Sequence, residues 1–517
     1  MRRDPVWSTG DPSLLTDHTT GRIFCFYTSS VNAGYASSRT GNDPEDPNIT
    51  QNDYSFSDDD GLTWQHRRIT GQSKDPAWAG MFAASGEGLQ LRHGPWAGRL
   101  IQQYVVRVNG GNYTVGVYSD DHGETWQYGV PVGPGADENK VSELSDGSVL
   151  LNVRARPRRL QAVSADGGVS YPKLQPVPEQ VGSGNNGHIT RLHPEAQPGS
   201  PESRVQVLSS THDATIRRNL SLYVSFDDGA TWPSRYVLDD DASAYSVITP
   251  LTQSRLGLLY EREAYATISY RELDLRTLNP APLLLSIPDG TVLQAGVENR
   301  VTVSATNQGV TTLNQISLGV DLDGSESAPQ SIPALPAGRT REVTVSIMVP
   351  QTVAGPRTLE LKATAKTKST PVNPRGGRVN ALRSADVEVA ASASAAPHPS
   401  LELTPCFDAV YPDYTAEGLV ADNAVAWVRL RNDGNVPLTD VTVSWNIDSS
   451  PLLVGTLPPG GTATISSRTG FDHRLLDAEV AAGVFAPQVT ASARAGDRSV
   501  SVTEPIPALD LRPRSVV

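Results

Sequence analysis

The chain has 517 residues, more than one hydrophobic core usually supports, so we expect two to four domains. Its 56 acidic and 43 basic side chains give a net charge of −13, which repels nucleic-acid phosphates and anionic lipid surfaces. We therefore expect no nucleic-acid partner. No apolar run approaches the length of a membrane span, so we also expect no membrane insertion. Cys25 and Cys406 lie far apart in sequence and in different predicted domains, so we expect no disulfide between them, and neither resembles a metal ligand.

One eight-residue pattern, Ser-x-Asp-x-Gly-x-Thr-Trp, occurs three times in the first half of the chain. Its aspartates are Asp59, Asp121 and Asp227, and a weaker copy contains Asp166. Ser and Asp side chains satisfy the amides of a tight turn, and Gly adopts backbone angles that a Cβ disfavours. The pattern therefore predicts structural turns, each with an aromatic ring packed beneath it.

Successive copies lie 45 to 62 residues apart, which is room for one four-stranded sheet each. The segments 99–106, 148–153 and 256–260 are short, β-rich and bounded by Gly, Asp or Pro. Repetition at this interval is typical of a β-propeller, which we place at residues 1–277.

After about residue 280 the composition changes to Val, Thr, Ala and Pro, with few aromatic residues. Alternating apolar and polar residues between turn signals predict two immunoglobulin-like β-sandwiches. The fold class is thus all-β: the propeller is followed by a sandwich at 278–390, an Ala/Ser/Pro linker at 391–399, and a second sandwich at 400–517.

The repeated pattern on a propeller resembles the bacterial sialidase (neuraminidase) family, in which it is called the Asp-box. The resemblance runs from Gly10-Asp-Pro-Ser to Glu261, about half of the chain. It implies a six-bladed propeller that removes terminal sialic acid from glycans, glycoproteins or glycolipids. It also implies a secreted or cell-surface protein, acting as a monomer without a cofactor or metal.

The same resemblance assigns the catalytic residues. Glu143, which precedes a Leu-Ser-Asp-Gly turn, matches the family's catalytic glutamate, and Tyr245 matches its nucleophilic tyrosine. Arg159 and Arg217 match arginines that bind the carboxylate of the substrate, and Glu261 matches a glutamate that orients a further arginine.

Other residues near these positions receive weaker assignments. Asp11 and Asn186 are candidates for lining the pocket. Four neighbouring arginines are interpreted as ordinary exposed residues of strands or loops: Arg154, Arg156, Arg158 and Arg218.

The residue types suit a sialoside, whose anomeric carbon carries a carboxylate. Planar guanidinium groups bind a carboxylate through directed, charge-assisted hydrogen bonds. A phenol approaches that anion without net charge, and sialidases with a tyrosine nucleophile are known exceptions among glycosidases. Because a free Tyr has a pKa near ~10, Tyr245 needs a base, for which the sequence suggests Glu143. A covalent intermediate and retention of configuration are then expected.

The family's first blade carries an arginine and an acid/base aspartate that have no counterpart here, and Arg2 and Arg3 are not convincing substitutes. We therefore expect an incomplete first blade, a signal peptide encoded upstream, and impaired hydrolysis. Two alternatives follow, a catalytically silent sialoside-binding module and an adhesion protein. Because every matched residue precedes the sandwiches, we expect them to be dispensable for chemistry and to serve targeting or spacing.

Overall fold

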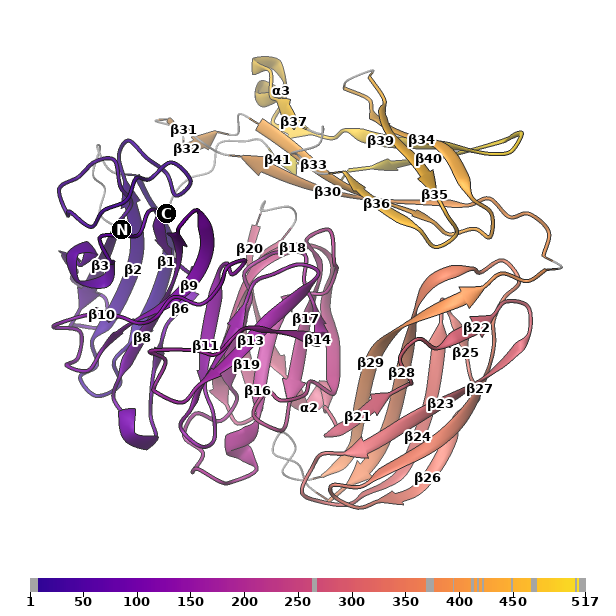
Figure 1. The fold of residues 1–517 in the computed structure, drawn as a ribbon, viewed down its shortest axis with the longest axis horizontal. Helices are drawn as coiled ribbons and strands as arrows, with labels where there is room; N and C mark the ends of the chain where they lie inside the picture. The colour runs from indigo at the N-terminus through magenta and orange to yellow at the C-terminus, as the bar shows by residue number, and fades with distance from the viewer. Residues whose placement is uncertain are drawn as a thin grey trace.

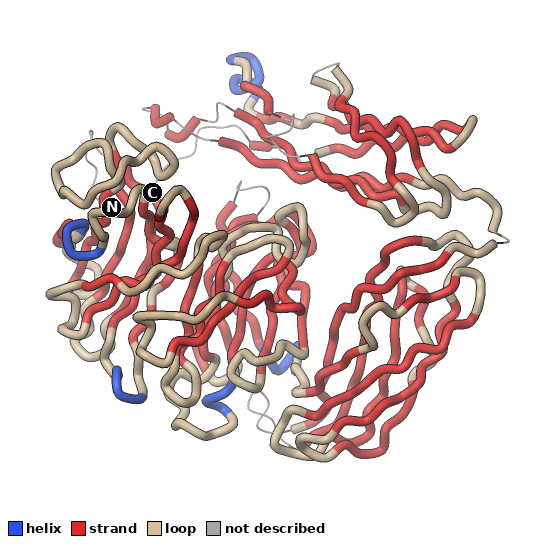
Figure 2. The backbone as a smooth tube through the Cα atoms, viewed as in Figure 1, coloured by secondary structure: helices blue, strands red, loops and turns tan. Residues whose placement is uncertain are grey.

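The computed structural model describes residues 8–262, 267–368, 376–393, 395–410, 413–415, 418–420, 423–447, 450–465, 472–506 and 509–510. Strands dominate, which confirms the all-β prediction (Figure 2). The α-helices are single turns or little more: α1 (Thr70–Ser73), α2 (Leu275–Leu278) and α3 (Asp477–Ala482). Within these ranges no helix is long and apolar enough to cross a membrane. Arg2 and Arg3 lie outside the described residues.

Sheets that are antiparallel apart from the parallel pairing of β1 (Ser8–Thr16) with β6 (Gly86–Glu87) follow one another along the first half of the chain (Figure 1). The first has the order β4 (Gln65–Arg68), β3 (Gln51–Ser57), β2 (Ile23–Ser30), β1 and β6. The second has the order β10 (Gln127–Tyr128), β9 (Gly111–Ser119), β8 (Leu100–Val108) and β5 (Met81–Ala83), with β7 (Leu89–Gln90) also on β8. The third has the order β11 (Asn139–Glu143), β12 (Val149–Val153), β13 (Arg158–Ser164) and β14 (Gln175–Val181).

The last propeller sheet is wider. Its order is β15 (His188–Arg191), β16 (Gln206–Thr211), β17 (Arg218–Ser225), β18 (Ser234–Thr252), β19 (Arg255–Arg262) and β20 (Thr267–Asp274). Strands β11, β15 and β18 contact one another in turn, and β18 also contacts β6, which pairs with β1. Inner strands from different sheets therefore surround a common axis, as in a β-propeller. A count of six blades stays a prediction.

The Asp-boxes form turns, as expected. In the first box the Asp59 carboxylate accepts hydrogen bonds from the Thr63 amide (2.8 Å) and hydroxyl (2.6 Å), and the other three boxes repeat the arrangement. The four box glycines have φ between 77° and 85°, where a Cβ would be strained. Trp126 and Trp232 are buried as predicted. Trp64 also packs against its turn, since its Nε1 donates to the Gly61 carbonyl at 2.9 Å, but its side chain is 45% exposed.

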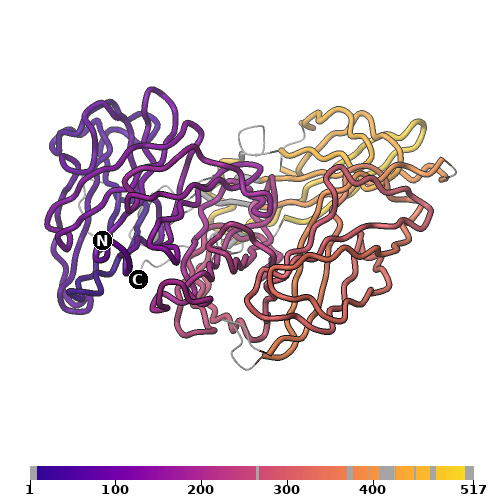
Figure 3. Tube along the Cα trace, turned by 60° about the horizontal axis from the view of Figure 1, so that its bottom comes forward, coloured from indigo at the N-terminus to yellow at the C-terminus, as the bar shows by residue number. Residues whose placement is uncertain are grey.

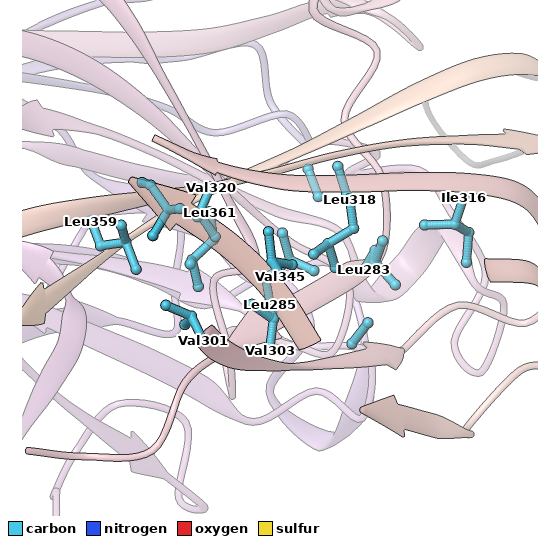
Figure 4. Packing of buried hydrophobic residues seen from close by; sticks show 14 of the residues in the cluster. Leu283, Leu285, Val301, Val303, Ile316, Leu318, Val320, Val345, Leu359 and Leu361 are labelled. Carbon is cyan, nitrogen blue, oxygen red and sulfur yellow. The ribbon is translucent and has the colours of Figure 1, made fainter. Parts of the chain in front are cut away.

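The first sandwich packs two sheets against each other. One contains β21 (Leu283–Ser286), β23 (Glu298–Asn307) and β27 (Thr340–Met348). The other contains β22 (Val292–Gln294), β29 (Gly377–Ala390), β28 (Gly355–Thr367), β24 (Leu313–Leu322), β25 (Ser325–Glu326) and β26 (Gln330–Leu335). Alternate residues of the facing strands, such as Val301, Val303, Leu318 and Leu361, form the core between them (Figure 4).

The C-terminal sandwich is built in the same way. One sheet contains β30 (Leu401–Val410), β33 (Asn423–Asn432), β36 (Thr462–Ile465) and β37 (Asp472–Arg474). The other contains β35 (Leu452–Leu457), β34 (Leu438–Trp445), β39 (Gln488–Ala495) and β40 (Arg498–Pro505). Two short antiparallel pairs complete it, β31 (Asp413–Thr415) with β32 (Gly418–Val420) and β38 (Val484–Phe485) with β41 (Leu509–Asp510).

The first sandwich lies beside the last propeller sheet, and the C-terminal sandwich turns back toward that sheet (Figures 1 and 3). The first sandwich is joined to the propeller by ion pairs from Arg235 to Glu360 and from Arg383 to Glu179. The second is joined to it by an ion pair from Arg429 to Asp213. A cavity of about 1080 Å³ lies between the three parts. Since opposite charges pair beside it, we interpret it as a polar domain interface.

Candidate active site

Tyr245 lies on the long strand β18, at a break in the pairing between β18 and β19. Such bulges redirect a side chain and are common beside active sites. The Tyr245 hydroxyl donates a hydrogen bond to Glu138 Oε2 (2.5 Å) and accepts one from Arg154 Nη1 (2.9 Å). A potential nucleophile thus touches a carboxylate base and a guanidinium group at once.

Glu138 and Arg154 are held together by the hairpin of β11 and β12. The last paired residues at its open end are Asn139 and Val153, and the Arg154 amide donates to the Glu138 carbonyl at 2.8 Å. Arg154 also forms an ion pair with the Glu138 carboxylate and approaches Asp137 at 3.3 Å. Glu138 is buried, so this ion pair and the tyrosine hydroxyl hold its carboxylate in place.

The structure corrects the sequence-based choice of base, because Glu143 is at the other end of the same hairpin. Five residues of extended strand separate it from Glu138, or about 16 Å at 3.3 Å per residue. Its carboxylate accepts hydrogen bonds from the amides of Arg92 (3.0 Å) and His93 (2.7 Å) and pairs with Arg191 (3.2 Å). Glu143 therefore has a structural role: its buried carboxylate holds the backbone at Arg92 and His93 and pairs with Arg191.

Arg217 and Glu261 lie beside Tyr245, as predicted. The Arg217 guanidinium is 5.5 Å from the centre of the Tyr245 ring. Glu261 accepts a hydrogen bond from the Tyr245 amide (3.0 Å) and thereby holds the backbone at the bulge. Burial raises the pKa of Glu261, while this amide and Arg217 act in the opposite direction.

Arg159 is placed differently from the prediction. It is 1% exposed, and its Nε donates to Asn152 (2.6 Å) and its Nη1 to the Asn185 carbonyl (3.0 Å). Burial lowers its pKa to about 10. A side chain enclosed in this way is not available to a substrate carboxylate, and Arg154 occupies the position that we had predicted for Arg159.

The other three arginines interpreted as exposed residues also make contacts. Arg156 lies over the ring of Trp427 at 5.1 Å, and Arg158 pairs with Asp386 at 3.1 Å, so both join the propeller to a sandwich. Arg218 is half-buried beside Asn219.

Tyr245, Glu138 and Arg154 open into a cavity of about 440 Å³. Asp11 lines the same cavity, as predicted, and accepts a hydrogen bond from Ser85 (3.2 Å). Asn186 does not line it: this residue is buried and donates to the Ser85 carbonyl (2.7 Å). Asn186 therefore supports the wall behind the cavity.

Tyr245 and Asp11, which both line the cavity, have raised pKa values. Burial raises the pKa of Tyr245 above its usual value, and the negative charge of Glu138 raises it further. The phenol is therefore neutral at rest, and its hydroxyl already donates to a carboxylate that can accept its proton. Burial, followed by Glu138, raises the pKa of Asp11 to about 6.

The shift at Asp11 predicts how stability varies with pH. Because the folded protein holds this proton more tightly than the unfolded chain, the contribution of Asp11 is fully present below about pH 4 and is lost as the pH rises through about 6. We expect Asp11→Asn to raise the melting temperature relative to wild type more at pH 7 than at pH 4.5. Asp60→Asn, which makes the same change at an exposed position outside the cavity and is measured over the same range, is the control. If the difference in melting temperature between Asp11→Asn and wild type did not change with pH, the raised pKa of Asp11 would be contradicted.

The chain is similar to known proteins over its propeller and its first sandwich. Residues 2–259 match the BNR repeat-like domain family, and residues 293–366 match the NPCBM-associated, NEW3 domain of alpha-galactosidase. A sialidase of Micromonospora viridifaciens is 42% identical over 351 residues, which cover 67% of this chain and 54% of that protein. A sialidase of Bacteroides fragilis is 25% identical over 283 residues, covering 52% and 50%. Among solved structures, a Hadza microbial sialidase has a TM-score of 0.47 at 25% identity and covers 53% of each chain.

The fold and the repeated turns define a β-propeller protein of the BNR-repeat class. Within that class, the chain belongs to the bacterial sialidase family. It spans about half the length of the curated relatives that it matches.

Proposed function

We propose that the protein is a retaining exo-α-sialidase in which Tyr245 is the nucleophile and Glu138 its general base. The observation that carries the proposal is the 2.5 Å hydrogen bond from the Tyr245 hydroxyl to a buried carboxylate. Arg154 and Arg217, which flank the tyrosine, are the proposed partners of the substrate's carboxylate. The proposed substrates are sialylated glycans, as the names of the relatives suggest.

In the first step the Tyr245 oxygen attacks the anomeric carbon and its proton passes to Glu138 Oε2. The bond to the aglycone breaks, and the aglycone oxygen takes the electron pair. In the second step water attacks the same carbon from the opposite face. The bond to Tyr245 breaks, and the phenolate recovers its proton from Glu138. The attacking water releases one proton to solvent, which balances the proton that the departing aglycone oxyanion takes from solvent, and sialic acid leaves with its original configuration.

Arg154 has a second role in this scheme. Its Nη1 donates to the Tyr245 oxygen and also pairs with Glu138, so it stabilises whichever of the two carries the negative charge. Positive charge from Arg154 and Arg217 already acts to lower the pKa of the tyrosine, against burial.

The test is hydrolysis of an aryl α-sialoside with an activated phenol, which needs little protonation to leave. We expect phenol release, with the α-anomer of sialic acid appearing first in the proton NMR spectrum. The β-anomer appearing first would contradict a covalent intermediate. Binding to sialosides on a glycan array without phenol release would favour a sialoside-binding module, and neither binding nor release would favour an adhesion protein.

A further inference from the structure

The loop at residues 212–217, between β16 and β17, carries Arg217 at its end and contacts the C-terminal sandwich. Asp213 organises this loop, because its Oδ1 accepts hydrogen bonds from the amide and the hydroxyl of Thr215, both at 2.9 Å. Its Oδ2 accepts from Arg429 Nη1 of the sandwich at 2.6 Å. The Asp213 side chain is only 2% exposed, so one buried carboxylate joins the folding of the loop to the neighbouring domain.

An apolar contact adds to this ion pair. Ile216 is fully buried and packs with Ala242 of β18 and with Cys406 and Trp427 of the sandwich. The Cys406 thiol also donates to the carbonyl oxygen of Arg217, at 3.6 Å. The sandwich therefore touches both Arg217 itself and the residue before it.

These sandwich residues come from one face of one sheet. Trp427 and Arg429 are two residues apart on β33, and Cys406 on β30 is the paired neighbour of Trp427. The far end of the same sandwich is also anchored, since the buried Arg357 of the first sandwich bonds to the Asp433 carbonyl (3.5 Å). Contacts at both ends hold this face against the loop.

We infer that the C-terminal sandwich is a positioning element for Arg217, and that Arg429 acts on the substrate's carboxylate through Asp213 and the loop. This inference rests on the proposed function, because it assigns carboxylate binding to Arg217. It differs from the expectation that the sandwiches are dispensable. A chain shortened to end near residue 280 would lack both sandwiches, and with them the contacts that support the loop.

The inference is tested with Arg429→Ala in the full chain, assayed on the activated aryl sialoside. We expect KM to rise roughly two- to thirtyfold with little change in kcat, since mutations in such networks typically change coupling by this amount. Arg429→Lys should recover part of the loss because it keeps a donor near Asp213. Arg498→Ala removes an equal charge from an exposed position on β40 and should leave KM unchanged.

A double-mutant cycle separates positioning from a general loss of stability. If Arg429 acts through Arg217, Arg429→Ala should have almost no further effect on KM in an Arg217→Ala background. The same rise in KM in both backgrounds would overturn the inference.

Hydrogen exchange gives a measurement that does not require turnover. Because the Thr215 and Ile216 amides donate to Asp213, Arg429→Ala should accelerate exchange in peptides covering 212–217, whereas Arg498→Ala should not. If wild type releases no phenol, the proposed function fails, but this result still tests the support of the loop. If exchange in peptides covering 212–217 were the same in Arg429→Ala and wild type, the inference that the sandwich supports the loop would be overturned.

Discussion

Tyr245→Phe should lower kcat for the activated aryl sialoside by roughly 10³-fold or more, as expected when a nucleophile is removed. Phe keeps the ring beneath the Arg217 guanidinium, 5.5 Å from its centre, and removes only the hydroxyl. Glu138 and Arg154 remain paired with each other after the change. We therefore expect KM to change little, and the loss to appear in steady-state kinetics as a fall in kcat.

Tyr270→Phe is the matched control, because Tyr270 lies on β20 with a side chain 60% exposed. Its kinetics should equal those of wild type, and both variants should melt close to the wild-type temperature. A tenfold fall in kcat is about what the loss of one binding contact produces, and the loss of a nucleophile produces much more. If Tyr245→Phe retained more than about a tenth of the wild-type kcat, Tyr245 would therefore not be the nucleophile.

The second large effect distinguishes the two glutamates of one hairpin. Glu138→Gln keeps the shape of the side chain but removes the base, and general acid–base catalysis typically contributes ~10²–10⁴-fold. We expect a fall in kcat of that size. The measurement is kcat across pH 5 to 8, over which the variant should stay slow because no ionisation restores the base.

Glu143→Gln should have the opposite pattern. It removes one partner of the buried pair with Arg191 (3.2 Å), which typically costs about 3–5 kcal/mol of stability. Since Glu143 does not contact Tyr245, kcat of the folded fraction should remain close to wild type. Equal losses of kcat in the two variants would remove the reason for preferring Glu138.

Much of the fold could be predicted because it depends on local, repeated chemistry. Each Asp-box satisfies its own turn amides, so the four copies could be recognised without knowing what surrounds them. How far each ring is exposed varies, from 1% at Trp232 to 45% at Trp64, because that depends on the neighbouring sheet, which the repeat does not specify.

The site was harder to predict because it depends on which end of a hairpin faces the axis. Glu138 precedes strand β11 and Glu143 ends it. The Leu-Ser-Asp-Gly turn after Glu143 favoured that end of the strand, whereas the site lies at the other end. One available signal was missed: Glu138 and Arg154 have opposite charges and lie just outside the two strands of one hairpin, where they become cross-strand neighbours. Tyr245, Arg217 and Glu261 needed no such choice between the ends of a hairpin.

The role of the C-terminal sandwich could not be predicted from sequence for a related reason. Arg429 and Asp213 are more than 200 residues apart and belong to different domains. Their contact depends on how the sandwiches fold back onto the propeller, which no local pattern encodes. An isolated Arg on a strand is usually a solvated residue, and only the assembled structure identifies its partner.

The central claim, a covalent bond to Tyr245, is tested most directly by trapping the intermediate. A sialosyl fluoride with a second fluorine on the adjacent carbon has a good leaving group. The second fluorine disfavours the positively charged transition states of both steps, so the intermediate should accumulate. After proteolysis, mass spectrometry should find one added fluorosialosyl group on the peptide that contains Tyr245, and none in Tyr245→Phe. Turnover of the aryl sialoside by wild type, with the added group on another residue or on none, would contradict the mechanism.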